Sequence, residues 1–96
     1  MYTITEIRDI VAPIAARYGV ERMTLFGSYA RGENTPESDM DFRVDRGRVR
    51  GMQMAFLLTD LEDALRVPVD LLSTNALDEA FLKAIRGEEK VIYERQ

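Results

Sequence analysis

The sequence predicts an α/β (α+β) domain in which a mixed sheet of about four strands carries helices mainly on one face. Segments with apolar residues at helical spacing alternate with short apolar runs of strand length. Helices between successive strands favour a mixed sheet with a helical layer. Ninety-six residues are enough for one core, so we expect residues 1–96 to form a single domain.

The composition narrows the chemistry that this domain can perform. With 46% hydrophobic and 31% charged residues, no apolar run of membrane-spanning length and no signal peptide, the chain is expected to be soluble and cytoplasmic, without membrane contact. The absence of cysteine and histidine excludes disulfides, thiolate zinc sites and the usual general base. A net charge of −4 argues against direct nucleic-acid binding. Carboxylates, hydroxyls and cations must therefore carry any catalysis.

The first predicted helix covers residues 3–18. Its apolar residues recur at helical spacing: Ile4, Ile7, Val11, Ile14 and Tyr18. Thr3 and Glu6 have the spacing of a capping box, and Gly19 is a natural stop. Pro13 should kink or divide this helix, because it lacks a backbone N–H.

A glycine turn follows the first predicted strand, residues 23–26. Gly27 permits a sharp turn and a close approach of the backbone to other atoms. If a helical turn opens at residues 28–31, its free N–H groups and the Ser28 hydroxyl would point at an anion, such as the phosphates of a nucleotide. Residues 33–38 then form a turn-rich loop.

Two carboxylates begin the next predicted strand. Apolar and polar residues alternate there: Asp39, Met40, Asp41, Phe42, Arg43 and Val44. Asp39 and Asp41 therefore project from the same side, about 6.5–7 Å apart at Cα. They can converge on one hard cation, and the pair looks like a magnesium site because Mg²⁺ prefers oxygen ligands and commonly uses carboxylates plus substrate phosphates.

The remaining elements follow in order. Residues 45–51 form a basic loop whose three arginines, Arg46, Arg48 and Arg50, could grip a triphosphate tail, dock an acidic patch on a partner, or simply be solvated. Residues 52–65 read as a second helix with an apolar face. A strand follows at residues 67–72, then a helix capped by Asn75 and ending near Arg86, and a closing strand at 91–93.

The turn and the carboxylates together carry a family resemblance. Gly27-Ser28, ten residues, and then Asp39-x-Asp41 resembles the signature of the polymerase-beta-like nucleotidyltransferase superfamily. The fuller strings Gly-Ser-Tyr-Ala-Arg-Gly and Ser-Asp-Met-Asp-Phe are similar to the minimal nucleotidyltransferases, which include the antitoxins of HEPN/MNT toxin–antitoxin pairs. The resemblance covers nearly the whole chain. It implies the nucleotidyltransferase fold, with residues 1–96 as one minimal nucleotidyltransferase domain.

The resemblance also bears on Asp70 and Arg31. The superfamily implies a third carboxylate on a later strand, and Asp70 is the candidate, between Val69 and Leu71. An acid at a strand edge in water is the alternative, but a charge inside an apolar strand is costly without a compensating partner, which favours the catalytic role. Arg31 would either orient phosphate or brace the 33–37 loop, and the family string favours the site.

By this resemblance, the chain is a Mg²⁺-dependent nucleotidyltransferase that uses ATP. Asp39 and Asp41 would hold the metal ions, two in number, against the phosphates, while Gly27 and Ser28 grip the triphosphate. Asp70 would complete the second metal site and help to deprotonate an acceptor hydroxyl, whose in-line attack on the α-phosphorus releases pyrophosphate.

The resemblance suggests a protein as the acceptor. A HEPN-type ribonuclease toxin would bind this antitoxin as a hetero-oligomer and be silenced by AMPylation of a tyrosine near its active site. Two alternatives stay open. The chain could be a non-catalytic antitoxin that neutralises its partner by occlusion, or a transferase subunit that acts on a small molecule or polynucleotide with a separate recognition chain.

Overall fold

Four strands form one mixed sheet in the computed structural model, which describes residues 2–96. In chain order the strands are β1 (Arg22–Phe26), β2 (Met40–Asp45), β3 (Val69–Ser73) and β4 (Lys90–Glu94). Their order across the sheet is β3-β2-β1-β4, with β1 antiparallel to both β2 and β4, and β2 parallel to β3. The predicted mixed sheet of four strands is confirmed, and β3 and β4 are its edges.

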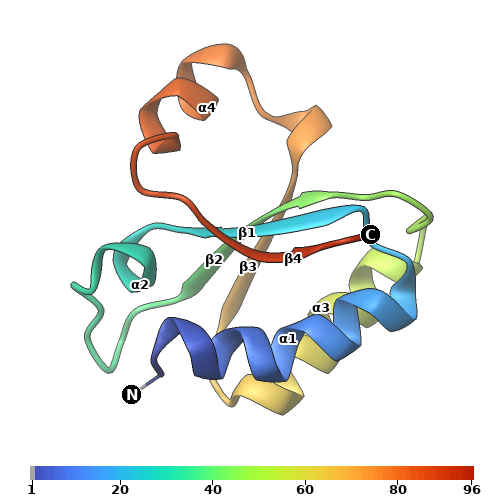
Figure 1. The fold of residues 1–96 in the computed structure, drawn as a ribbon, viewed down its shortest axis with the longest axis horizontal. Coiled ribbons are helices and arrows are strands. Elements are labelled where there is room, and N and C mark those ends of the chain that lie inside the picture. The colour runs from blue at the N-terminus through green and yellow to red at the C-terminus, as the bar shows by residue number, and fades with distance from the viewer. Residues whose placement is uncertain (1) are drawn as a thin grey trace.

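The helices lie unequally on the two faces of the sheet. Helices α1 (Ile4–Tyr18) and α3 (Gln53–Leu65) run side by side over one face, while α4 (Glu79–Ile85) stands off the opposite face (Figure 1). The one-turn helix α2 (Ser28–Arg31) lies at the end of β1. Fully buried side chains of the helical face and of the central strands form the core: Ile7, Val11, Met23, Leu25, Met40, Phe42, Val44, Leu57, Leu61 and Leu65.

Helix α1 has the predicted ends but not the predicted break. Thr3 accepts from the backbone N–H of Glu6, the Glu6 side chain accepts from that of Thr3, and Gly19 closes the helix in the left-handed conformation. Pro13 does not divide the helix. The proline is exposed, so the carbonyl that loses its N–H partner can be hydrated, and the buried residues on either side keep the helix against the sheet.

The start of the last helix was predicted wrongly. Residues Thr74–Ala76 form a 3₁₀ turn, and Asp78, not Asn75, caps α4 by accepting from the N–H of Phe81. Asp78 competes successfully because its carboxylate reaches this free N–H, which marks the helix start. Helix α4 therefore has only two turns, and within it only Ile85 is buried.

Candidate active site

Three carboxylates meet at one end of strands β2 and β3. The burial of β2 alternates from Met40 onward, which places Asp41 on the face opposite the core helices, as predicted. Asp41 is the register partner of Asp70 across the parallel β2–β3 ladder, and paired residues of neighbouring strands lie about 5 Å apart with side chains on the same face. Asp39 immediately precedes β2. The structure thus brings all three predicted acids together.

Asp41 is the electrostatic centre of this group. Burial, together with the charges of Asp70 and Asp39, raises the pKa of Asp41 from 3.8 to about 6, although Arg31 acts in the opposite direction. A carboxylate among like charges is costly to ionise, which is a common property of functional sites. The acids therefore form a coupled cluster that favours a positively charged ligand.

Asp70 lies on a strand after the second long helix, as predicted, but the argument that burial of its charge requires a partner was wrong. Asp70 is exposed, because β3 is an edge strand and its polar face is open to solvent. Desolvation therefore does not demand a partner for this charge. The feature that singles out Asp70 is its register with Asp41.

Gly27 ends β1 directly against Asp41. Its φ of 79° and ψ of −159° lie in a region that residues with a side chain avoid. A Cβ at this position would collide with Oδ2 of Asp41. The glycine is therefore required twice, for its backbone conformation and for the close approach of the turn to the carboxylate, and it brings the Gly27-Ser28 turn beside the acids.

Arg31 joins this turn to a residue that the sequence did not single out. Its guanidinium donates to Oε1 of Glu33 at 2.9 Å and to the two carboxylate oxygens of Glu88 at 3.1 and 3.2 Å. Glu88 also accepts a hydrogen bond from the Gly27 backbone N–H at 2.6 Å. Glu88 lies just before β4, far along the chain, so only the pairing of β4 with β1 brings it to the site. No local pattern could have found it.

The carboxylate oxygens of the three acids are of the chemical type that Mg²⁺ prefers. Burial and the charges of Asp70 and Asp39 raise the pKa of Asp41, and a divalent cation would offset the repulsion between these charges. Within residues 2–96, however, no three acidic, histidine or cysteine side chains are already arranged to hold a metal ion. Asp39, Asp41 and Asp70 are neighbours rather than a closed ligand set.

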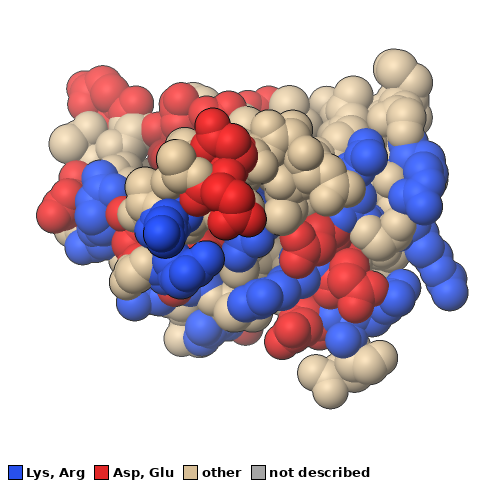
Figure 2. All heavy atoms as spheres, turned by 90° about the horizontal axis from the view of Figure 1, so that it is seen from above, with Lys and Arg blue, Asp and Glu red and all other residues tan. Residues whose placement is uncertain are grey.

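The basic loop lies at the other end of β2. Arg48 packs on Gly19, and its N–H donates to the carbonyl of that glycine at 2.9 Å, while Arg50 donates to the carbonyl of Gly47 at 2.8 Å. Four residues of β2 lie between Asp41 and Arg46, the first arginine of the loop, so the two Cα atoms are about 16 Å apart. The loop therefore does not face the carboxylates, and the idea that it grips a triphosphate beside them is wrong. Figure 2 shows basic and acidic side chains interspersed on the α4 side of the molecule.

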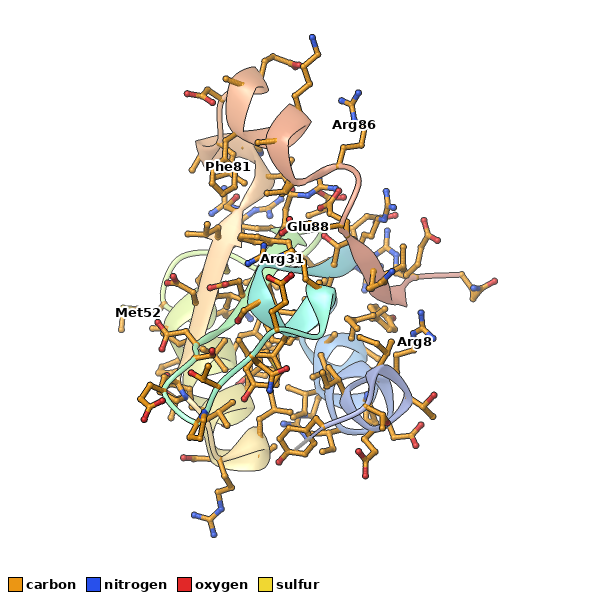
Figure 3. All side chains as sticks on the ribbon, turned by 90° about the vertical axis from the view of Figure 1, so that its left-hand side faces the viewer. Arg8, Arg31, Met52, Phe81, Arg86 and Glu88 are labelled. Carbon is orange, nitrogen blue, oxygen red and sulfur yellow. The ribbon has the colours of Figure 1, made fainter. Side chains whose placement is uncertain are left out.

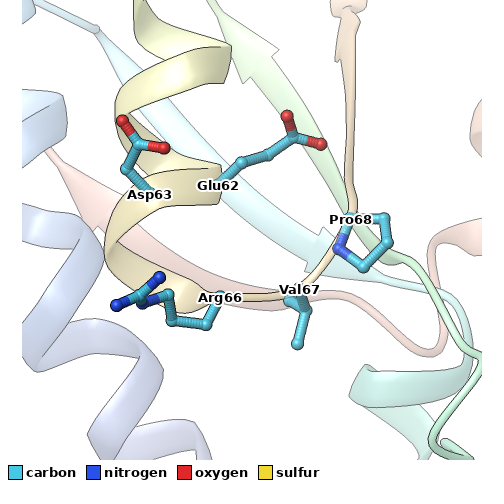
Figure 4. A pocket seen from close by; sticks show the side chains of 5 residues that line it. All are labelled: Glu62, Asp63, Arg66, Val67 and Pro68. Atoms are coloured by element: carbon cyan, nitrogen blue, oxygen red, sulfur yellow. The ribbon is translucent and has the colours of Figure 1, made fainter.

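Two hollows in the described surface lie away from the carboxylates. One of about 440 Å³ lies at the end of α3 and is lined by Glu62, Asp63, Arg66, Val67 and Pro68 (Figure 4). A second, of about 310 Å³, lies between Tyr2, Tyr29 and residues 34–36. Neither hollow is lined by Asp39, Asp41 or Asp70.

A comparison with known protein families identifies the family of this chain. The family model described as polymerase beta, nucleotidyltransferase, matches residues 9–96 of the chain. The chain belongs to this nucleotidyltransferase family. Membership confirms the predicted resemblance and fold class. Within residues 2–96, no helix combines the length and apolar character needed to cross a membrane.

Full-length relatives carry a more specific name. The chain is 33% identical over 98 residues to the protein adenylyltransferase MntA of Thermococcus cleftensis, an alignment that covers 97% of each protein. It is 37% identical over 98 residues to a Methanocaldococcus jannaschii protein that is provisionally named a protein adenylyltransferase, covering 97% of this chain and 99% of that protein.

Solved structures of this nucleotidyltransferase family share the fold. A structure described as a minimal nucleotidyltransferase is 34% identical, has a TM-score of 0.77 and matches 86% of both chains. One chain of the structure of a tri-AMPylated Shewanella oneidensis HEPN toxin in complex with MNT antitoxin superposes with a TM-score of 0.72 at 18% identity, covering 98% of this chain and 75% of that one. At this identity the likeness concerns the fold alone.

Proposed function

We propose that this nucleotidyltransferase is a Mg²⁺-dependent protein adenylyltransferase that transfers AMP from ATP to a hydroxyl of a HEPN-type toxin and thereby acts as its antitoxin. The observation that carries the proposal is the register of Asp41 with Asp70 beneath the Gly27 turn. The names of the relatives from Methanocaldococcus jannaschii and Thermococcus cleftensis support the reaction, and the Shewanella oneidensis complex supports the acceptor.

Each residue of the cluster has a role in this reaction. Asp39 and Asp41 would hold Mg²⁺ against the phosphates of ATP, with Asp70 completing the site for a second ion. Bound there, the ions supply positive charge that offsets the charge developing on the entering and leaving oxygens. Gly27, Ser28 and Arg31 would bind the triphosphate through backbone N–H, hydroxyl and guanidinium groups.

The chemical step is a substitution at the α-phosphorus. Asp70 accepts the proton of the acceptor hydroxyl, whose oxygen bonds to the α-phosphorus as the bond to the bridging oxygen breaks. Pyrophosphate leaves and the acceptor retains AMP. Because the exposed Asp70 borders the open edge of the sheet, a side chain of a second protein can reach it.

The test is transfer of AMP to the toxin encoded beside this chain. With ATP and Mg²⁺, the toxin should gain the mass of AMP, measured on the intact protein. Asp39→Ala should lower the rate by roughly a thousandfold, because the site loses a metal ligand. Asp63→Ala, which removes an exposed acid of α3, is the matched control and should react like the wild type. A toxin of unchanged mass after incubation with the wild-type chain would count against the proposal.

A second experiment, on the protection of cells, separates chemistry from occlusion. A variant lacking Asp39, Asp41 and Asp70 should no longer protect cells from the toxin, although it still binds the toxin. Full protection by that variant would favour the non-catalytic antitoxin.

A further inference from the structure

Glu88 places its carboxylate on donors that the proposed function assigns to phosphate. One of its oxygens accepts from the Gly27 backbone N–H at 2.6 Å, and both accept from Nη1 of Arg31 at 3.1 and 3.2 Å. Arg31 and Glu88 lie side by side in Figure 3. A single anionic side chain thus bridges an amide of the turn and the guanidinium of α2.

A phosphate oxygen and a carboxylate oxygen make the same demands on these donors. Both are anionic acceptors that form short, charge-assisted hydrogen bonds with N–H groups and with arginine. The Gly27 amide has one proton and cannot serve Glu88 and a nucleotide fully at the same time. Binding of a triphosphate at this turn therefore requires that Glu88 release the amide.

The neighbouring residue shows which part of the chain can move. Glu89 accepts from Arg43 at 2.7 and 3.0 Å and from the hydroxyl of Thr24 at 3.0 Å. The side chains of Arg43 and Glu89 are only 15% and 14% exposed, so this contact holds the backbone at the start of β4 to the sheet. Glu88 is 21% exposed and has rotatable side-chain bonds, so it can turn towards solvent while the backbone remains in place.

We propose that Glu88 is a built-in competitor of the nucleotide, a carboxylate that occupies the phosphate donors of Gly27 and Arg31 until a triphosphate displaces it. This inference rests on the proposed function. Its consequence is a raised threshold for nucleotide binding, since the observed affinity is reduced by the fraction of molecules in which the donors are occupied. Glu33 offers a natural comparison, because it binds Arg31 but not Gly27 and is 66% exposed.

The experiment compares Glu88→Gln with Glu33→Gln. Binding of a non-hydrolysable ATP analogue with Mg²⁺ is measured by calorimetry, and the Gly27 amide is followed by NMR without nucleotide. Glu88→Gln should bind the analogue about tenfold more tightly, the factor expected from weakening one charge-assisted hydrogen bond. Its Gly27 amide proton should move upfield as the carboxylate contact is lost. Glu33→Gln, which also removes a charge from Arg31, should change neither quantity appreciably.

A third measurement needs no variant and covers the case in which Glu88→Gln does not fold. In the wild type, the carboxylate carbon signal of Glu88 should shift when the analogue binds, while that of Glu89 stays unchanged.

The outcomes separate this inference from the proposed function. If the wild type binds the analogue but Glu88→Gln binds it equally or more weakly, Glu88 only braces Arg31 and the inference is overturned. A Glu88 carboxylate signal that stays unchanged on binding overturns it as well. If neither the wild type nor Glu88→Gln binds the analogue, the proposed function fails and the competitor role fails with it.

Discussion

At the scale of single residues, the ionised carboxylate of Asp41 destabilises the folded protein. Its carboxylate lies beneath Gly27 with other acids around it, and its pKa is raised to about 6. A residue selected for stability alone would not be an acid in this partly buried position. This destabilisation is explained if the negative charge is needed to bind a cation, because functional sites commonly trade stability for activity.

This destabilisation predicts that Asp41→Asn stabilises the protein. The pKa of Asp41 is higher in the folded chain than its ordinary value of 3.8, so the folded state binds the proton more tightly and the ionised form is destabilising. Since the carboxylate is still partly in water, we expect a gain of about 1 kcal/mol in the free energy of unfolding at pH 7.5. Urea unfolding in the presence of a chelator measures it.

The pH dependence of this gain provides its own control. The difference between Asp41→Asn and wild type should be full above the folded pKa of about 6 and should disappear as the pH falls through 3.8. Asp63→Asn, at an exposed position of α3, is the matched control and should change the free energy of unfolding by less than about 0.5 kcal/mol at pH 7.5. An Asp41→Asn variant less stable than the wild type at pH 7.5 would contradict this account.

At the scale of elements, the turn from β1 into α2 is the most constrained part of the site. The chain must turn at Gly27, the Gly27 N–H must reach Glu88, and the turn must leave room for the Asp41 side chain. The following glycine, Gly32, also has a positive φ, of 73°, but nothing lies within 4 Å of the position where its Cβ would be. The two positions therefore differ in the room that they leave for a side chain, in addition to their backbone conformation.

That difference predicts unequal effects of alanine at the two positions. Gly27→Ala should lower the free energy of unfolding by about 3 kcal/mol, because it combines a disfavoured backbone conformation with a collision against Asp41. Gly32→Ala should cost only about 1 kcal/mol, the penalty of the left-handed conformation. Urea unfolding of both variants measures this, and equal losses would show that the collision is relieved at no cost.

At the scale of the whole molecule, buried contacts on the polar face join segments that are far apart in sequence. Arg43 of β2 and Glu89 before β4 pair across β1, whose Thr24 hydroxyl donates to the same carboxylate. On the same face, Phe26 and Phe81 meet edge to face with ring centroids 5.7 Å apart, which attaches α4 to the sheet. These contacts place Glu88 over the Gly27 turn.

The buried pair predicts a large loss of stability from Glu89→Ala. Removing this acid leaves Arg43 partly buried without its charge partner, and we expect a loss of about 2 kcal/mol in the free energy of unfolding. Glu94→Ala is the matched control in β4, because its contact with Arg22 is long, at 4.0 Å, and exposed, and should cost less than about 0.5 kcal/mol. Chemical unfolding compares the two, and a similar small loss for both would mean that the buried pair contributes little.

The sequence by itself determined the helices and strands of the core, the Gly27-Ser28 turn and the two acids of β2. These features depend on neighbours in the chain, through the alternation around Asp41, the capping box at Thr3 and the signature that joins the turn to the acids. Local patterns misplaced the start of α4, where Asp78 competes with Asn75, and began β3 two residues too early. They also misjudged the effect of Pro13 on α1.

Only the tertiary structure decided which charges share the site. Strand pairing brings Asp70 into register with Asp41 at an exposed edge, carries the arginine loop to the far end of β2, and sets Glu88 on the Gly27 amide. The physical reason is that sheet order and register join segments many residues apart, whereas sequence periodicity reports only which face of its own element a side chain occupies.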